Sequence, residues 1–175
     1  INEDTDLTIT GISISDVDIG TGSAQVTLGV ASGTISLSGT TGLTFTTGDG
    51  ASDASMVFTG TLANVNTALN NLVYRGDANY NGSDTLDIDI NDQGNAGTGG
   101  TLTDSDSIAI TVNAVNDAPV LTVPTAQSIN EDTDLTITGI SISDVDIGTG
   151  SAQVTLGVAS GTISLSGTTG LTFTT

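Results

Sequence analysis

Oxygen-bearing side chains recur in short clusters along the chain, each beside a glycine, a turn signal or a proline. Hard cations such as calcium take about six to eight oxygen ligands from carboxylates, amides and backbone carbonyls. Because the sequence contains neither Cys nor His, softer transition metals lack their preferred ligands. The sequence therefore predicts Ca²⁺ sites, with these candidate ligands: Glu3, Asp16, Asp18, Asp77, Asn79, Asp92, Asn116, Asp117, Asp144 and Asp146.

Each cluster also has a simpler explanation, because Asp and Asn favour turns by bonding to their own backbone. The strongest candidates are Asp144 and Asp146, which lie near the linker residue Asp117. An EF-hand starting at Asp16 is excluded, because its loop needs Gly at position 6 and Glu at position 12, where this chain has threonines. Four further aspartates fit a solvated strand face or a loop and are not assigned: Asp87, Asp89, Asp104 and Asp106.

The charge balance excludes several partners. The chain of 175 residues has 20 acidic residues and one basic residue, Arg75, for a net charge of −19. Binding to nucleic acid or to an anionic membrane surface needs clustered Lys and Arg. No apolar run approaches the roughly 20 residues of a membrane span. The uncompensated charge must repel itself or recruit cations, and the absence of Cys excludes disulfides.

Alternating apolar residues predict that strands position these ligands. Leu7 and Ile9 share a face, and a bulge at Gly11 would shift the phase to Ile12 and Ile14. Further alternating runs are centred on residues 28, 36, 44, 88 and 110, with Gly, Asp, Asn and Ser between them. Many short strands separated by turns indicate an all-β, Greek-key β-sandwich.

One segment departs from this alternation. Residues 60–74 contain four apolar residues at helical spacing, Leu62, Val65, Leu69 and Leu72, with Thr61 as a plausible N-cap. We therefore expect one short helix per repeat, packed over an end or edge of the sandwich.

The chain contains an internal repeat. Residues 1–47 and 129–175 are identical, at a spacing of 128 residues, which is the size of a domain. We expect one sandwich over residues 1–117 and the N-terminal part of a second, identical one over 118–175, both belonging to a longer tandem array. Residues 118–124 contain Pro119 and Pro124, which stiffen the connection.

The order of the motifs resembles the cadherin-like repeats of large bacterial adhesins. That family carries a glutamate motif near its first strand, a DxD motif before a glycine, a DRE-type motif, a DxG motif and an NDNAP linker. Here INEDT, SDVDIG, GDAN, NDQG and VNDAP follow in the same order. Two departures are visible: Asn79 replaces the glutamate of the DRE motif, and the linker is one residue shorter. The resemblance therefore implies fewer or weaker calcium ions at each junction.

The resemblance also implies how the ligands are grouped. Glu3, Asp77 and Asn79 would lie at the end of the first repeat next to linker residues Asn116 and Asp117. Asp144 and Asp146 would approach from the second repeat. Asp16, Asp18 and Asp92 would lie at the opposite end of the first repeat.

The expected function is a calcium-stiffened spacer in a giant extracellular adhesin or filament on a bacterial cell surface. Its partners would be neighbouring repeats of the same protein. The alternative is a repeat that itself adheres, by self-association into filaments or by glycan binding. Catalysis is not expected, because few aromatic residues are available to hold a sugar ring between paired carboxylates. The tripeptide Arg75-Gly76-Asp77 matches a cell-attachment motif, but Asp77 fits a metal ligand better.

Overall fold

The computed structural model describes residues 1–94 and 98–174, so Thr175, the last residue of the expected second repeat, lies outside the described residues. The chain divides into two units, Ile1–Asn116 and Asp117–Thr175. Among the described residues, no helix has the length and apolar character needed to cross a membrane.

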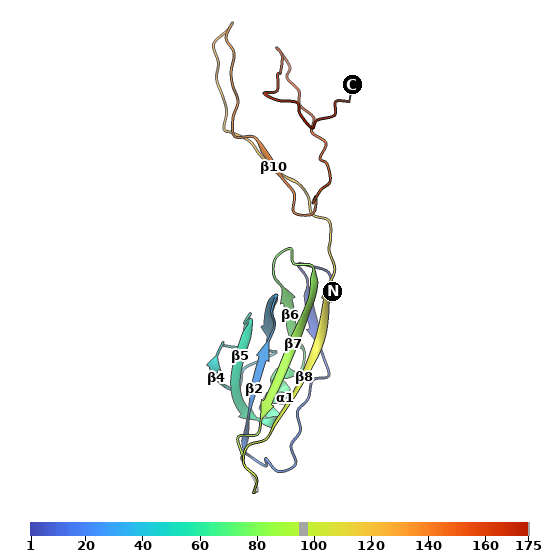
Figure 1. The fold of residues 1–175 in the computed structure, drawn as a ribbon. Coiled ribbons are helices and arrows are strands. Elements are labelled where there is room, and N and C mark those ends of the chain that lie inside the picture. Colours follow the sequence, from blue (N-terminus) through green and yellow to red (C-terminus); the bar gives the residue numbers. More distant parts are fainter. Residues whose placement is uncertain (95–97, 175) are drawn as a thin grey trace. The chain divides into compact units, whose positions relative to one another are not determined.

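The first unit has an all-β, sandwich-like fold built from two antiparallel sheets (Figure 1). The smaller sheet has the order β1-β6-β3 and the larger one the order β4-β5-β2-β7-β8. The strands of the smaller sheet are β1 (Asp6–Ile9), β6 (Leu72–Gly76) and β3 (Gly33–Ser36). Those of the larger sheet are β4 (Thr44–Thr47), β5 (Ser55–Thr61), β2 (Ser23–Gly29), β7 (Gly82–Asn91) and β8 (Thr103–Val112).

The core lies between the two sheets. Val26 and Leu28 of β2 are fully buried, as are Phe58 of β5, Ile35 of β3 and Tyr74 of β6. Alternate residues of β2 are buried, as expected for a strand with one face on a core. The predicted alternation on β7 is also confirmed: Leu86 is buried, whereas Asp87 and Asp89 are exposed.

The predicted helix is confirmed as α1 (Leu62–Leu69), with Thr61 as its N-cap. The Thr61 side chain accepts a hydrogen bond from the Asn64 N–H, and Val65, Ala68 and Leu69 are buried. Leu72 was wrongly assigned to the helical pattern, since it is the first residue of β6. The helix ends because Asn70 is extended and Asn71 adopts a positive φ of 62°, which reverses the chain into the strand.

The predicted bulge at Gly11 is wrong, because β1 ends at Ile9 and residues 10–16 form no strand. Gly11 has φ of 85°, a conformation that favours glycine. Beyond it, the Ile14 N–H donates to Asn66 Oδ1 at 2.7 Å, and Asn66 Nδ2 donates to the Ile14 carbonyl at 2.9 Å. A helix side chain therefore takes the hydrogen bonds that a neighbouring strand would otherwise make.

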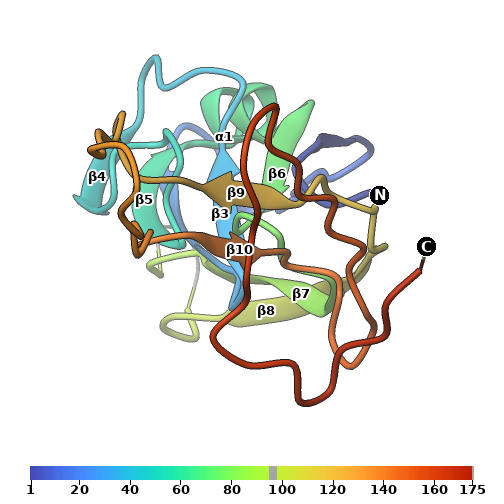
Figure 2. The same cartoon turned by 90° about the horizontal axis from the view of Figure 1, so that it is seen from above.

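The second unit contains two short strands, β9 (Val120–Thr122) and β10 (Ser141–Ser143), which pair antiparallel (Figure 2). Strand β9 lies between Pro119 and Pro124, in the segment that the sequence had indicated only as a connection. Most apolar side chains of this unit are exposed, among them Leu121, Val154 and Phe173.

Candidate metal centre

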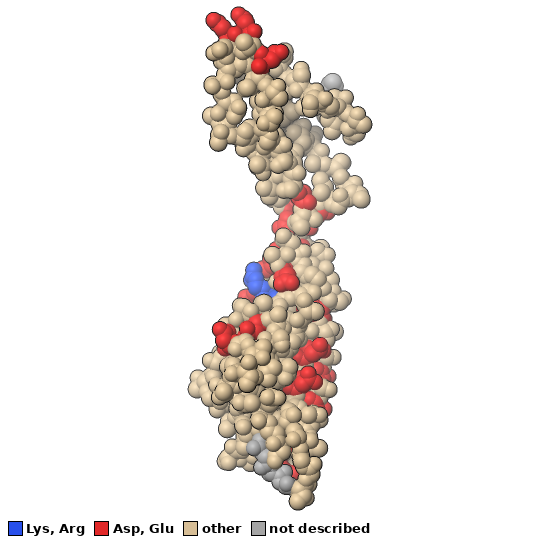
Figure 3. Space-filling model, turned by 60° about the vertical axis from the view of Figure 1, so that its left-hand side comes forward, with Lys and Arg blue, Asp and Glu red and all other residues tan. Residues whose placement is uncertain are grey.

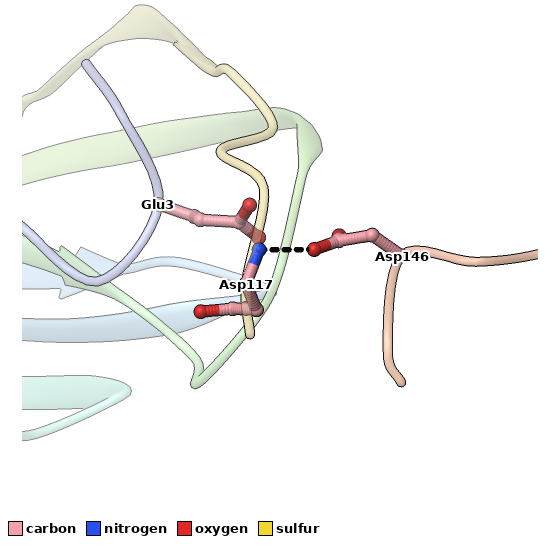
Figure 4. Close-up of side chains that lie close together, drawn as sticks. All are labelled: Glu3, Asp117 and Asp146. Carbon is pink, nitrogen blue, oxygen red and sulfur yellow. Dashed lines mark hydrogen bonds between the residues drawn. The ribbon is translucent and has the colours of Figure 1, made fainter. Parts of the chain in front are cut away.

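The carboxylate of Glu3 lies at the end of the first unit where the chain leaves it. Glu3 is only 4% exposed, and its backbone N–H donates to the Asn113 carbonyl at 2.9 Å. One carboxylate oxygen accepts a short hydrogen bond from the Val115 N–H, and the other accepts from Asn81 Nδ2 at 3.5 Å. Glu3 (Figure 4) thus holds the start of the linker against the sandwich.

Asp77 and Asn79 belong to the loop between β6 and β7, at the same end of the unit. The loop lies close to the Glu3 turn, because the Asn79 N–H donates to Asp4 Oδ1 at 3.1 Å. Asp77 and Asn79 are both exposed. The Asp77 N–H donates to the Ser32 carbonyl at 3.2 Å, which ties the loop to the turn before β3. Antiparallel pairing explains this proximity, since Asp6 at the start of β1 pairs with Arg75 at the end of β6.

The second unit contains two of the predicted carboxylate ligands. Asp144 Oδ1 accepts the N–H groups of Asp146 at 2.9 Å and Ile147 at 3.0 Å. Asp146 Oδ2 accepts the N–H of linker residue Asp117 at 2.5 Å (Figure 4). Asn116, the remaining linker candidate, is exposed. The Asp144 turn leaves carboxylate oxygens available to further ligands, since each oxygen has two lone pairs.

The other three candidates lie at the opposite end of the first unit. Asp16 Oδ1 accepts the N–H groups of Asp18 at 2.8 Å and Ile19 at 3.0 Å, the turn that Asp144 repeats. Asp92 Oδ1 accepts the N–H groups of Gly94 and Leu102, both at 2.8 Å, and these bonds lower its pKa. The three side chains line one cleft of about 900 Å³, together with Asp104 and Asp106.

The aspartates of β8 occupy a position that the sequence did not indicate. Asp104 and Asp106 are exposed, as expected, but in register they lie opposite Ile90 and Ile88 of β7. Directly opposed residues of an antiparallel pair project to the same face. The two aspartates therefore lie on the inward-facing side of β8, at the mouth of the cleft, rather than on its outer face.

Little of the acidic charge is neutralised within the chain. Among the residues that the structure describes, one ion pair forms, between Arg75 Nη1 and Asp6 Oδ1 at 2.9 Å. Figure 3 shows the side chain of Arg75, the chain's one basic residue, as the single blue patch among red carboxylates. Arg75 of the Arg-Gly-Asp tripeptide is thus paired with Asp6, and its side chain is 54% exposed.

Sequence reasoning missed a buried carboxylate, Asp84 of β7, which is 5% exposed. It accepts the N–H groups of Ala31 and Ser32, both at 3.0 Å, and the Tyr74 hydroxyl at 3.0 Å. Burial alone would raise the pKa of Asp84, but these donors and the Thr85 N–H outweigh it and lower that pKa. Burial, together with the bond to Asp84, raises the pKa of Tyr74. The signal was available, since Asp84 is in phase with Leu86 and Ile88.

Comparison with protein-family models, with curated proteins and with solved structures found no match for this chain.

Proposed function

We propose that this chain is a calcium-stiffened spacer from a large extracellular adhesin or filament, made of cadherin-like, Greek-key repeats. The observation that carries the proposal is the Glu3 carboxylate, which is almost fully buried and holds the linker at Val115. Its two hydrogen bonds, from the Val115 N–H and from Asn81 Nδ2, leave a lone pair on each carboxylate oxygen that can bind a cation.

The second unit supports the same junction independently. Its Asp146 binds the linker at Asp117, two residues beyond the anchor of Glu3. Two residues of chain span less than about 8 Å, whatever the orientation of the two units. We therefore propose that a cation gathers Glu3, Asp117 and Asp146 at the linker, with Asp144, Asn116, Asp77 and Asn79 as further oxygen donors.

Calcium fits this donor set better than other metals. The candidate ligands are carboxylates, amide oxygens and carbonyls, and the chain has no His or Cys. Magnesium demands a tight octahedron and keeps several waters, whereas calcium accepts the irregular oxygen shell that a linker and two loops provide. A net charge of −19 also gives the folded chain a general affinity for divalent cations.

A spacer suits identical repeats, since it needs length rather than variety. Long β-sandwiches joined end to end add length in proportion to their number, and ions at the junctions would prevent bending. We propose no catalytic role, because the chain has few aromatic residues that could hold a sugar ring between paired carboxylates. The expected location is the outer surface of a bacterial cell.

Thermal unfolding with and without metal tests the proposal. Calcium at about 100 times its dissociation constant stabilises the folded state by roughly 2.7 kcal/mol per site. We expect calcium to raise the melting temperature, magnesium to raise it less, and EDTA to abolish the gain. Glu3→Gln should reduce the gain, whereas Asp87→Asn, on an exposed strand face, should leave it unchanged. A melting temperature that is indifferent to EDTA would refute calcium binding.

A second candidate function is adhesion by self-association, which identical repeats would also suit. Sedimentation velocity at increasing concentration, with calcium present, separates the two candidates. A monomer at all concentrations supports the spacer, whereas concentration-dependent assembly supports adhesion.

A further inference from the structure

The contact between Asn81 and Glu3 joins the loop before β7 to the start of the linker. Asn81 Nδ2 donates to one carboxylate oxygen of Glu3 at 3.5 Å, while the other oxygen accepts from the Val115 N–H. Glu3 is almost fully buried, whereas Asn81 is exposed. The amide of Asn81 is therefore a neutral, water-accessible group held against the carboxylate that binds the linker.

The residue after Asn81 is Gly82, and together they form the one Asn-Gly dipeptide of the chain. The backbone nitrogen that follows an asparagine can attack the side-chain amide, and a side chain on the attacking residue hinders its approach. Glycine has no Cβ and therefore offers the least hindrance. Asn81 also precedes β7 and lies outside the register of the sheet. By its sequence context, Asn81 is thus the asparagine of this chain that is most open to such an attack.

The structure shows why a glycine follows Asn81. Gly82 has φ of 147°, which favours glycine, and a Cβ there would lie 3.0 Å from Tyr80 Oη, closer than side chains normally pack. The Tyr80 hydroxyl donates to the Ser83 carbonyl at 2.7 Å, which holds its ring in this place. The glycine that makes Asn81 reactive is therefore required by the backbone.

We propose that Asn81 is a site of spontaneous deamidation, which places a new carboxylate beside Glu3. The Gly82 nitrogen forms a bond to Asn81 Cγ and gives up its proton, and the Cγ–Nδ2 bond breaks to release ammonia. Water then opens the resulting succinimide ring to aspartate or isoaspartate. The reaction consumes one water and releases one ammonia for each asparagine, and nothing is oxidised or reduced. The product carries one more negative charge than the asparagine.

The new carboxylate changes the surroundings of Glu3 in two ways. Without a cation, it cannot donate a hydrogen bond to Glu3 and repels it. With calcium, it offers a charged oxygen in place of an amide, and the affinity of a calcium site depends on how many charged ligands it has. Deamidation should therefore weaken the fold in EDTA but tighten calcium binding, so that the junction stiffens as the protein ages. The effect on calcium rests on the proposed calcium site, whereas the deamidation itself does not.

Mass spectrometry of the folded chain tests the modification. During incubation for several weeks in EDTA at mildly alkaline pH, position 81 should change from amide to acid before any other asparagine does. Asn81→Gln should stay unmodified at this position, because a glutamine would have to close a larger ring. A first change at another asparagine would overturn the proposal. A folded chain that stays unmodified while the urea-unfolded chain reacts would overturn it equally.

Calcium titration, followed by calorimetry and by thermal unfolding, tests the consequence. Asn81→Asp should bind calcium more tightly than the wild type, on the order of tenfold, and should melt at a lower temperature in EDTA. Asn81→Ser loses the donor without gaining a charge, so it should lower the melting temperature in EDTA without raising the affinity. Asn71→Asp is the matched control, because it adds the same charge to an exposed asparagine at the opposite end of β6. An affinity of Asn81→Asp equal to that of the wild type would overturn the effect on calcium.

Failure of this inference and failure of the proposed function give different results. If neither the wild type nor Asn81→Asp binds calcium, the calcium site is refuted together with the effect on its affinity, and mass spectrometry in EDTA still decides the modification. If the wild type binds calcium and Asn81→Asp binds it no more tightly, the calcium site stands and only the role of the new carboxylate is refuted. Aged wild-type protein, separated from fresh protein by anion exchange, supplies the natural product if Asn81→Asp does not fold.

Discussion

At the residue scale, Asp84 of β7 connects its strand to the turn before β3. It is nearly buried and accepts hydrogen bonds from three backbone N–H groups and from Tyr74. Hydrogen bonds to a charged group contribute about 1.5–3 kcal/mol each, and loss of an acceptor leaves donors buried. We expect Asp84→Asn to lower the free energy of unfolding by about 2–3 kcal/mol in urea. Asp87→Asn on the exposed face of the same strand should change it by less than about 0.5 kcal/mol.

The lowered pKa of Asp84 also predicts a pH dependence. A carboxylate whose pKa is lower in the folded state stabilises the fold above its unfolded pKa, about 3.9, and loses that contribution as the pH falls through the folded pKa. The difference in unfolding free energy between the wild type and Asp84→Asn should therefore be constant from about pH 5 to 8 and shrink below about pH 4. Urea titrations at each pH measure it. A difference that grows on acidification would contradict the lowered pKa.

At the scale of elements, α1 does more than cover the core, since its Asn66 holds residues 10–16 in place. Both hydrogen bonds of Asn66 go to the backbone of Ile14. Asn66→Ala should cost about 1–3 kcal/mol, because a partly buried N–H and carbonyl lose their partners. Hydrogen exchange at residues 12–15 should become faster. Exchange in β2 and β7 should change only by the amount that the change in global stability produces. Thr67→Ala, on the exposed face of the helix, is the control; equal protection of residues 12–15 in both variants would contradict the role of Asn66.

At the scale of the whole molecule, the proposed calcium site predicts how stiff the linker is. If Glu3, Asp117 and Asp146 share a cation as proposed, their mutual repulsion, about 1 kcal/mol per pair at 4 Å in water, is replaced by attraction to the ion. In a chain of two complete repeats, Asp146→Ala should leave each repeat folded yet shorten the maximum dimension in small-angle scattering with calcium. The control substitution Asp87→Ala should leave the maximum dimension unchanged. An unchanged dimension for Asp146→Ala would mean that Pro119 and Pro124 stiffen the linker without metal.

The sequence alone determined the class of the fold and much of its detail. Period-2 apolar patterns located β1, β2, β3, β4, β7 and β8, because one face of each strand packs on the core, but they did not predict β5 or β6. Helical spacing with an N-cap located α1, because both signals are local. The motifs around Glu3, Asp77 and Asn79 were expected at one end of the repeat, and the structure places them there, since antiparallel pairing brings their loops together.

Only the tertiary structure decided what depends on a partner distant in sequence. Asp84 is buried because the turn at Ala31 and Ser32 reaches it, which no local pattern encodes. Residues 13–15 and 141–143 have one sequence, yet the first segment bonds to Asn66 and the second forms β10 against β9. Likewise Val26 is buried and the identical Val154 is exposed. A strand acquires its hydrogen bonds and its burial from its neighbours, so identical segments take different structures where those neighbours differ.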